Sequence, residues 1–341
     1  HLFLNEKILF DPTFAGFSTF IIYFGNTFAN YLRDANEKKQ IRGAFSQYLS
    51  PALVEQLAND PDKLVLGGET KKMTFLFCDV RGFTTISESF KSDPQGLTKL
   101  INRFLTPLTN EIINVNGTID KYMGDCIMAF WNAPIDVEGH EKLACDATLR
   151  MHKAMAELNA IRKEEAEAQN KNFLELKIGI GLNTGGCVVG NMGSDQRFDY
   201  SVLGDSVNLA ARLEGQSKSY GVKTVIGPET HESVKDTYAT LQLDLIAVKG
   251  KKEAVTIFTL AGDNEFKESS EFKNLESKHV KILEYYFNQK WKNCLNEMKL
   301  AKMLCNNLMS EYYEIITERI NEYEKNPPPK NWDGVYVATS K

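Results

Sequence analysis

Residues 73–84, MTFLFCDVRGFT, form an apolar run that ends in an acidic residue and a glycine-containing turn. An apolar run of this length, bounded by a turn signal, predicts a buried strand that carries Asp79 to the edge of a sheet. The turn that follows can present several backbone N–H groups to an anion. The stretch therefore predicts a strand end that is suited to a metal ion and a phosphate.

A second acidic residue lies in a similar setting, Asp125 in KYMGDCIMAF (residues 121–130). Two carboxylates, each beside a glycine and an apolar strand, are what a two-metal phosphoryl-transfer site requires. Lys121 precedes Asp125 by four residues on the same predicted hairpin, so strand alternation places both side chains on one face. Lys121 is then either a surface charge or a group that contacts a base or a phosphate.

The third informative stretch is GDSVNLAARLE, residues 204–214. Asn208 and Arg212 are four residues apart and share one face of a predicted helix that begins near Asp205. An amide and a guanidinium presented together suit the positioning of a ribose and the stabilisation of a phosphate transition state. The alternative is a solvated helix face. Lys249, in a closing hairpin, is likewise either a surface charge or a phosphate contact.

The composition limits the possible functions. The chain has 341 residues, is 43% hydrophobic and 25% charged, and carries a net charge of −5, which argues against a general nucleic-acid binder. Its six cysteines form no CxxC pair and predict reduced thiols in a cytosolic compartment. The sequence contains neither the GxxxxGK[ST] phosphate loop nor HExxH.

The N-terminal region, residues 1–33, contains an uncharged run at 12–32 that is rich in aromatic residues. As a helix this run is about as long as a hydrocarbon core is thick, which favours a transmembrane helix, although Asn26 and Asn30 argue for an amphipathic or buried one. More Lys and Arg residues follow the run than precede it. The positive-inside rule then predicts an inner-membrane protein whose catalytic part is cytoplasmic. The first residue is not Met, which suggests a fragment of a longer protein.

Residues 34–65 show helical spacing with a joint at Ser50–Pro51. This linker either pairs two chains and carries a signal or packs on its own domain. Residues 66–263 alternate strands and helices and predict an α+β fold, a ferredoxin-like βααβ/βαβ sandwich over a mostly antiparallel sheet. Within it we expect two helices over 95–115, divided near Pro107, and two strands on either side of a glycine-rich turn near residues 183–186. Residues 264–341 predict a helical hairpin and a Pro/Trp tail used for packing or partner binding.

Four motifs in this order, FLFCDVRGFT, KYMGDCIMAF, YSVLGDSVNLAARLEG and VKGK, resemble a class III nucleotidyl cyclase catalytic domain over roughly residues 66–261. The flanking segments RGAFSQYLSPALVEQL and PPPKNWDGVY resemble those of bacterial membrane cyclases that carry a CHASE-type sensor ahead of the last transmembrane helix. The resemblance implies a head-to-tail homodimer with two active sites at its interface, and an adenylate cyclase, a lyase that acts in signal transduction.

The resemblance also implies roles for residues of one chain at each site. Asp79 and Asp125 would hold two Mg²⁺ or Mn²⁺ ions, with the Val80 carbonyl as a further ligand. Phosphate would be contacted by the backbone N–H groups around Gly82, Phe83 and Thr84.

The second chain would complete the site. Asn208 would orient the ribose, Arg212 would bind the α-phosphate, and Lys249 would neutralise the terminal phosphates. Attack of the ribose 3′-hydroxyl on the α-phosphate of ATP would then give 3′,5′-cyclic AMP and pyrophosphate.

Base choice would rest on Lys121 and Ser201. Lys121 fits adenine, as in adenylate cyclases of the family. Ser201 stands where many members have aspartate and resembles the threonine/serine subclass, whose hydroxyl can accept from the adenine 6-amino group. Two alternatives are a catalytically silent cyclase fold that binds nucleotides or acts as a scaffold, and a guanylate cyclase.

Overall fold

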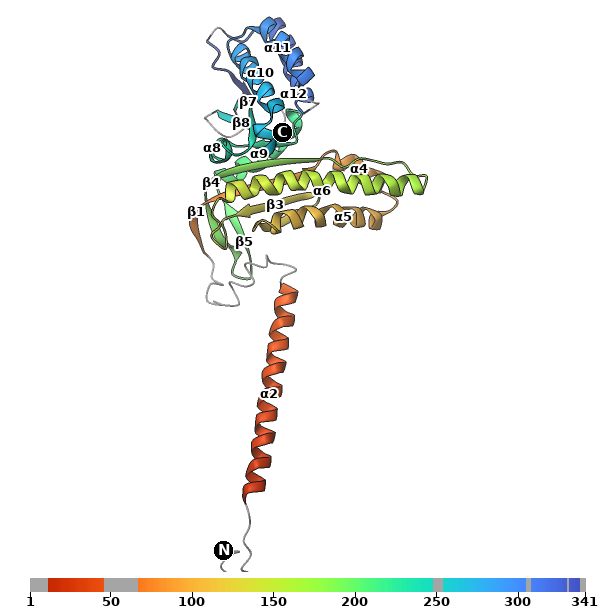
Figure 1. The fold of residues 1–341 in the computed structure, drawn as a ribbon, viewed down its shortest axis with the longest axis vertical. Helices are drawn as coiled ribbons and strands as arrows, with labels where there is room; N and C mark the ends of the chain where they lie inside the picture. The colour runs from red at the N-terminus through yellow and green to blue at the C-terminus, as the bar shows by residue number, and fades with distance from the viewer. Residues whose placement is uncertain (1–11, 46–66, 248–253, 305–307, 330, 338–341) are drawn as a thin grey trace, which may run out of the picture. The chain divides into compact units, whose positions relative to one another are not determined.

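The computed structural model describes residues 12–45, 67–247, 254–304, 308–329 and 331–337. The chain divides into two compact units, His1–Lys63 and Leu64–Lys341, which are described separately below. Figure 1 shows the elements of each unit.

The first unit contains the helix α2, Pro12–Phe45. It is continuous and joins the run at 12–32 to the start of the predicted linker. None of the helices in the described parts of the chain has a stretch long and apolar enough to cross a membrane, so the predicted transmembrane helix at 12–32 is not supported. Asn26 and Asn30 lower the hydropathy of the run. The Ser50–Pro51 joint lies outside the described residues.

The second unit is built on one sheet with the strand order β2-β3-β1-β4-β6-β8-β7-β9, and β5 pairs with β4. Among the described strands, only the β4–β6 and β7–β9 pairs are parallel, which agrees with the predicted α+β fold and mostly antiparallel sheet. The strands are β1 (Gly67–Val80), β2 (Thr118–Met123), β3 (Cys126–Trp131), β4 (Ile178–Ser194), β5 (Arg197–Leu203), β6 (Thr224–Ile226), β7 (Ala239–Ala247), β8 (Val255–Gly262) and β9 (Val335–Val337).

Helices α5 (Pro94–Ile113) and α6 (His140–Ala168) cover one face of this sheet (Figure 1). The predicted break near Pro107 is wrong, because α5 runs through the proline without interruption. Phe104, Leu108 and Ile112 are buried at four-residue spacing on both sides of Pro107, so packing keeps the helix together across the missing N–H.

The predicted turn in the glycine-rich segment is also wrong, since β4 is one strand of 17 residues. Its glycines do not form a turn. They leave room for helix α7 (Asp205–Ser219) to pack against the strand. A Cβ atom on Gly181 would lie 2.2 Å from the backbone nitrogen of Glu214, and one on Gly185 would lie 2.3 Å from Ser206 Oγ. The glycines therefore let α7 lie directly on the strand.

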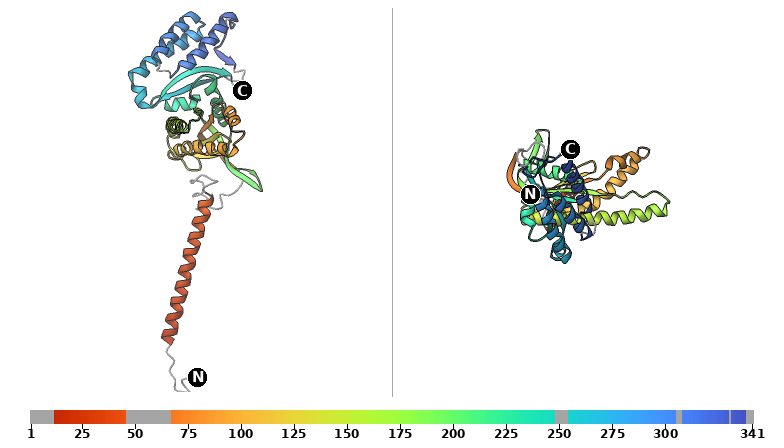
Figure 2. Two further views of the ribbon diagram at one scale, coloured as in Figure 1. Left: turned by 90° about the vertical axis from the view of Figure 1, so that its right-hand side faces the viewer. Right: turned by 90° about the horizontal axis from the view of Figure 1, so that it is seen from above.

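Helix α7 and strand β5 cover part of the other face of the sheet, where Phe75 and Phe77 of β1 pack in a cluster with Val202 and Val207. The hairpin of β4 and β5 extends beyond the body of the domain (Figure 2). The shorter helices of this part are α4 (Phe83–Ser89) and α8 (Pro228–Val234).

The C-terminal segment packs on the domain and contributes a strand to its sheet. Its helices are α9 (Asn264–Glu268), α10 (Ser270–Phe287), α11 (Trp291–Leu304) and α12 (Ser310–Lys325), which is more than the predicted hairpin. Strand β9 then pairs with β7, and Trp332 packs edge-on against Tyr286 and Tyr323. The tail therefore folds back onto its own domain.

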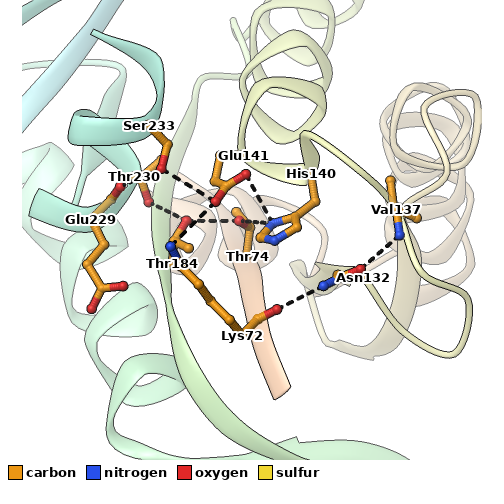
Figure 3. Close-up of polar contacts among 10 residues, drawn as sticks. All are labelled: Lys72, Thr74, Asn132, Val137, His140, Glu141, Thr184, Glu229, Thr230 and Ser233. Carbon is orange, nitrogen blue, oxygen red and sulfur yellow. Dashed lines mark hydrogen bonds and ion pairs between the residues drawn. The ribbon is translucent and has the colours of Figure 1, made fainter.

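A buried polar chain joins β1, β4, α6 and α8 (Figure 3). Thr74 Oγ1 lies 2.7 Å from His140 Nδ1 and 2.8 Å from Thr184 Oγ1, which in turn lies 2.9 Å from Thr230 Oγ1. Burial lowers the pKa of His140, which favours the neutral ring at pH 7. Its Nδ1 pairs with the Thr74 hydroxyl and also lies 3.6 Å from Glu141 Oε2. Each buried group has a partner, and we assign this chain a structural role.

Candidate functional site

The paired acids

Asp79 and Asp125 are brought together, as the sequence predicted. Asp79 is the last but one residue of β1, and Asp125 lies in the turn between β2 and β3. Cys78 pairs with Ile127 across the ladder, which places the end of β1 beside this turn. The two carboxyl groups are hydrogen-bonded, and burial together with the charge of Asp125 raises the pKa of Asp79 to about 6. Two carboxylates in this position repel each other, and a cation between them would relieve the repulsion.

This pair fits a divalent ion whose coordination is completed by substrate. Mg²⁺ is usually held by one or two carboxylates together with phosphate oxygens and waters. Within the described ranges, no group of three or more His, Cys, Asp or Glu side chains is arranged to hold a metal ion. Asp79 and Asp125 would therefore offer two carboxylates to such an ion. Val80, whose carbonyl is the further predicted ligand, follows Asp79 directly and is the last residue of β1.

The phosphate turn

The turn after β1 has the geometry of a helix start. Gly82 adopts a left-handed conformation with φ = 70°, which favours glycine, and it precedes α4. Its carbonyl accepts from the N–H groups of Thr85 and Ile86. The N–H groups of Phe83 and Thr84 lie in the first helical turn, where backbone donors have no intrahelical acceptor. These are the donors that the sequence predicts for phosphate.

The face of helix α7

Two charged groups near the acids were missed in the sequence. Glu214 of α7 lies close enough to Asp79 and Asp125 that burial, followed by these charges, raises its pKa to about 7. Arg81 lies near Glu214 and reaches the end of α7, where its Nη2 donates to the carbonyls of Ser217 (3.2 Å) and Val222. Arg81 follows Asp79 by two residues, whereas no spacing rule links Glu214 to the acids, because its proximity depends on how α7 packs on β4.

Asn208 and Arg212 occupy α7 as predicted, with Asn208 exposed and Arg212 half-buried. Glu214 is turned toward the acids of its own chain. Because Glu214 follows Arg212 by two residues, the two side chains are about 200° apart around the helix. Arg212 therefore points away from the Asp79 of its own chain, and the structure does not bring Asn208 or Arg212 to the paired acids of the same chain.

The base-recognition cluster

Lys121 and Ser201 meet at a third residue that the sequence analysis did not single out. Ser201 Oγ donates a 2.9 Å hydrogen bond to Asp120 Oδ2, and Lys121 Nζ lies 3.7 Å from Asp120 Oδ1. The Asp120 side chain is 1% exposed, whereas that of Lys121 is 43% exposed. Among the residues that the structure describes, Asp120 Oδ1 has no hydrogen-bond partner. The pair predicted to choose the base is therefore connected through a buried carboxylate.

Lys249, the predicted contact for the terminal phosphates, lies outside the described residues. A cavity of about 450 Å³ lies between α6, β4 and the segment before α12, lined among others by Arg81, His152 and Lys223. Its lining includes neither of the paired acids nor Lys121. None of the predicted site residues that the structure describes lines this cavity.

Relation to known proteins

Residues 67–262 match the family model of the adenylate and guanylate cyclase catalytic domain. The chain therefore belongs to this family. An adenylate cyclase of Anabaena cylindrica is 30% identical over 228 residues, which cover 65% of this chain and 44% of the relative. Adenylate cyclase 1 of Rhizobium meliloti is 29% identical over 192 residues, which cover 56% of this chain and 28% of the relative. The chain thus spans less than half the length of these two relatives.

Solved structures of the family have the same fold. The adenylyl cyclase CyaB from P. aeruginosa is 36% identical with a TM-score of 0.50, over 57% of this chain and 96% of that one. The guanylyl cyclase Cya2 is 31% identical with a TM-score of 0.50, over 59% of this chain and 96% of that one. The fold is therefore that of a class III cyclase domain, whereas the relatives include enzymes named for each of the two nucleotides.

Proposed function

We propose that this chain is an adenylate cyclase that converts ATP to 3′,5′-cyclic AMP and pyrophosphate at the interface of a homodimer. The observation that carries the proposal is the Asp79–Asp125 pair next to the phosphate turn, in a domain of the cyclase family. Lys121, a donor that suits adenine N1, supports ATP as the substrate. Attachment to the inner membrane and an upstream CHASE-type sensor stay predictions of the sequence.

The chemistry requires little covalent participation by the protein. Asp79 and Asp125 would hold two Mg²⁺ or Mn²⁺ ions, which would lower the pKa of the ribose 3′-hydroxyl and neutralise charge on the triphosphate. The N–H groups of Phe83 and Thr84 would hold phosphate oxygens. The 3′-oxygen forms a bond to the α-phosphorus while the bond from that phosphorus to the bridging oxygen breaks, and pyrophosphate leaves. The rate enhancement would come from the positioning of the substrate and from the stabilisation of charge in the transition state.

The orientation of α7 supports a site shared between two chains. Glu214 faces the acids of its own chain, and Arg212 is on the opposite side of the helix. Asn208 and Arg212 can therefore serve the acids of a partner that docks against α7. There Asn208 would orient the ribose, Arg212 would stabilise charge on the α-phosphate, and Lys249 would contact the terminal phosphates.

Mixing two inactive variants tests both the chemistry and the sharing. Asp79→Ala and Arg212→Ala should each be nearly inactive, because each damages both sites of a homodimer. A one-to-one mixture that exchanges subunits should recover about a quarter of wild-type activity, since half of the dimers are mixed and each has one intact site. Asp79→Ala mixed with Asp125→Ala is the matched control, which should recover nothing because both changes fall in the same half of the site.

The outcomes separate the candidate functions. Absence of recovery in a mixture shown to exchange subunits would mean that the site lies within one chain. Absence of pyrophosphate release from ATP with Mn²⁺ by a folded wild-type dimer would favour the silent nucleotide-binding or scaffold module. Because the guanylyl cyclase Cya2 is also similar to this chain, GTP is assayed in parallel, and a preference for GTP would identify a guanylate cyclase.

A further inference from the structure

Asp120 lies where strand β2 departs from regular alternation. Ile119 pairs with Ala129 and Lys121 pairs with Met128, so Asp120 is an extra residue on β2, a β-bulge. In an unbroken strand the side chains of Asp120 and Lys121 would point to opposite faces of the sheet. A bulge redirects a side chain. Here it lets both residues reach the same place, with Lys121 Nζ 3.7 Å from Asp120 Oδ1.

The buried carboxylate of Asp120 fixes the direction of one hydrogen bond. A serine hydroxyl has one proton to donate and two lone pairs that accept. Ser201 gives its proton to Asp120 Oδ2 over 2.9 Å, and Ser201 is itself buried. As long as Asp120 is a carboxylate it can only accept, so the hydroxyl cannot turn its proton elsewhere without leaving that carboxylate unsatisfied. The Ser201 hydroxyl can therefore only accept a hydrogen bond from a ligand, through its lone pairs.

We infer that Asp120 is a specificity-determining residue, which selects adenine over a 6-oxo purine by holding the Ser201 hydroxyl as an acceptor. The inference rests on the proposed nucleotide cyclase function. Adenine presents an amino donor at position 6, whereas guanine presents the O6 acceptor. The amino group would find a lone pair on Ser201. O6 would meet the same lone pair with no proton between the two oxygens.

Asp120 acts through Ser201 and does not itself touch the base, so it is a positioning residue. The same carboxylate attracts Lys121, because Ser201 is bonded to one of its oxygens and the Lys121 ammonium lies 3.7 Å from the other. Lys121 is a donor that suits the N1 acceptor of adenine and is mismatched to the N1–H of a 6-oxo purine. One buried acid thereby sets an acceptor and a donor side by side, in the order that adenine requires.

The Asp120→Asn variant tests the inference directly. The amide oxygen should turn toward the Lys121 ammonium, because only that atom can accept, and the NH₂ group would then face Ser201. Ser201 would accept from the amide and release its own proton toward the base. We expect kcat/KM for ATP to fall and that for ITP to rise. ITP differs from ATP only at position 6 and N1, and the ATP/ITP ratio should drop by about tenfold or more.

Three further variants make the test specific. Asp120→Glu keeps a carboxylate and should retain most of the wild-type ratio. Ser201→Ala should lower the ratio, and adding Asp120→Asn to Ser201→Ala should not change it further, because the hydroxyl that Asp120 orients is gone. Asp199→Asn is the matched control. It removes a nearby carboxylate on β5 that is exposed, and it should leave the ratio unchanged.

A folded and active Asp120→Asn enzyme with the wild-type ATP/ITP ratio would overturn the inference. If that variant does not fold, Asp120→Ala provides the same test, because it also frees the Ser201 proton, and an unchanged ratio would again count against us. Failure of the proposed function looks different. A silent module would turn over neither ATP nor ITP in any variant, and a guanylate cyclase would prefer GTP to ATP already as the wild type.

Discussion

Arg319 of α12 and Asp244 of β7 form an ion pair in which the two side chains are only 7% and 1% exposed. Tyr220, the residue that ends α7, donates a 2.7 Å hydrogen bond to the same carboxylate. The guanidinium also lies 3.5 Å from the ring centre of Tyr336 in β9. One buried pair therefore joins the C-terminal segment, the sheet and the helix that carries Asn208 and Arg212.

Arg319→Ala should destabilise the protein by about 3–5 kcal/mol, because it leaves the Asp244 carboxylate buried without its counter-ion. Urea unfolding at pH 7 measures the loss. The matched control is Arg103→Ala, which breaks an Arg–Glu165 pair of 2.6 Å whose side chains are 41% and 46% exposed. Exposed pairs contribute at most about 1 kcal/mol. Equal losses in the two variants would contradict the structural role given to Arg319.

Gly181→Ala should lower both stability and turnover. The added Cβ would lie 2.2 Å from the Glu214 nitrogen and 2.4 Å from the Ala210 carbonyl, so the backbone of α7 must shift. Overpacking of this kind costs about 1–3 kcal/mol, and the shift would displace Arg212. Gly186→Ala is the control in the same strand, since no atom of the described residues, its two chain neighbours apart, lies within 4 Å of its Cβ position. Unfolding curves and cyclic AMP formation should separate the two variants.

Asp79→Asn should stabilise the metal-free protein while abolishing its activity. The pKa of Asp79 is raised to about 6 by burial and by Asp125, so the folded state disfavours the ionised form. The gain in free energy of unfolding should be fully present above pH 6 and should fade as the pH falls toward 4, where the unfolded state also becomes protonated. Because Asp79 is only partly buried, solvent screens part of this effect, and we expect a gain of roughly 1 kcal/mol.

Urea unfolding with a chelator at pH 7.5 and pH 4.5 measures this difference. Asp195→Asn, in the exposed turn between β4 and β5, is the control and should have little effect at either pH. A loss of stability in Asp79→Asn at pH 7.5 would show that the two acids do not repel each other.

The parts of the site that are local in sequence could be predicted from it. Asp79 lies at the end of an apolar strand, and Asp125 lies in the turn that joins two others. Pairing of these strands brings the two acids together. Asn208 and Arg212 follow from helical periodicity alone. The family match confirms the domain to which these motifs belong.

The misses share a physical reason, which is that tertiary packing overrode a local rule. Proline usually interrupts a helix and glycine usually interrupts a strand. Pro107 nevertheless lies within a well-packed helix, and the glycines of β4 lie under α7. Asp120 was overlooked because strict alternation assigns it to the wrong face, and only pairing with β3 shows the extra residue. The nearness of Glu214 to the acids, and the contacts of Arg81 with Ser217 and Val222, required the three-dimensional position of α7.

The parallel pairing of β9 with β7 has a practical consequence for work with fragments of this protein. The family match ends at residue 262, but Phe272, Ile282, Tyr312 and Ile316, which come after it, share one apolar cluster with Leu241 and Leu243 of β7. Cutting the chain at the family boundary would expose that cluster to water and leave the edge of β7 open to pairing with other molecules. A fragment that ends at 262 should aggregate, whereas one that extends through Val337 should remain dispersed.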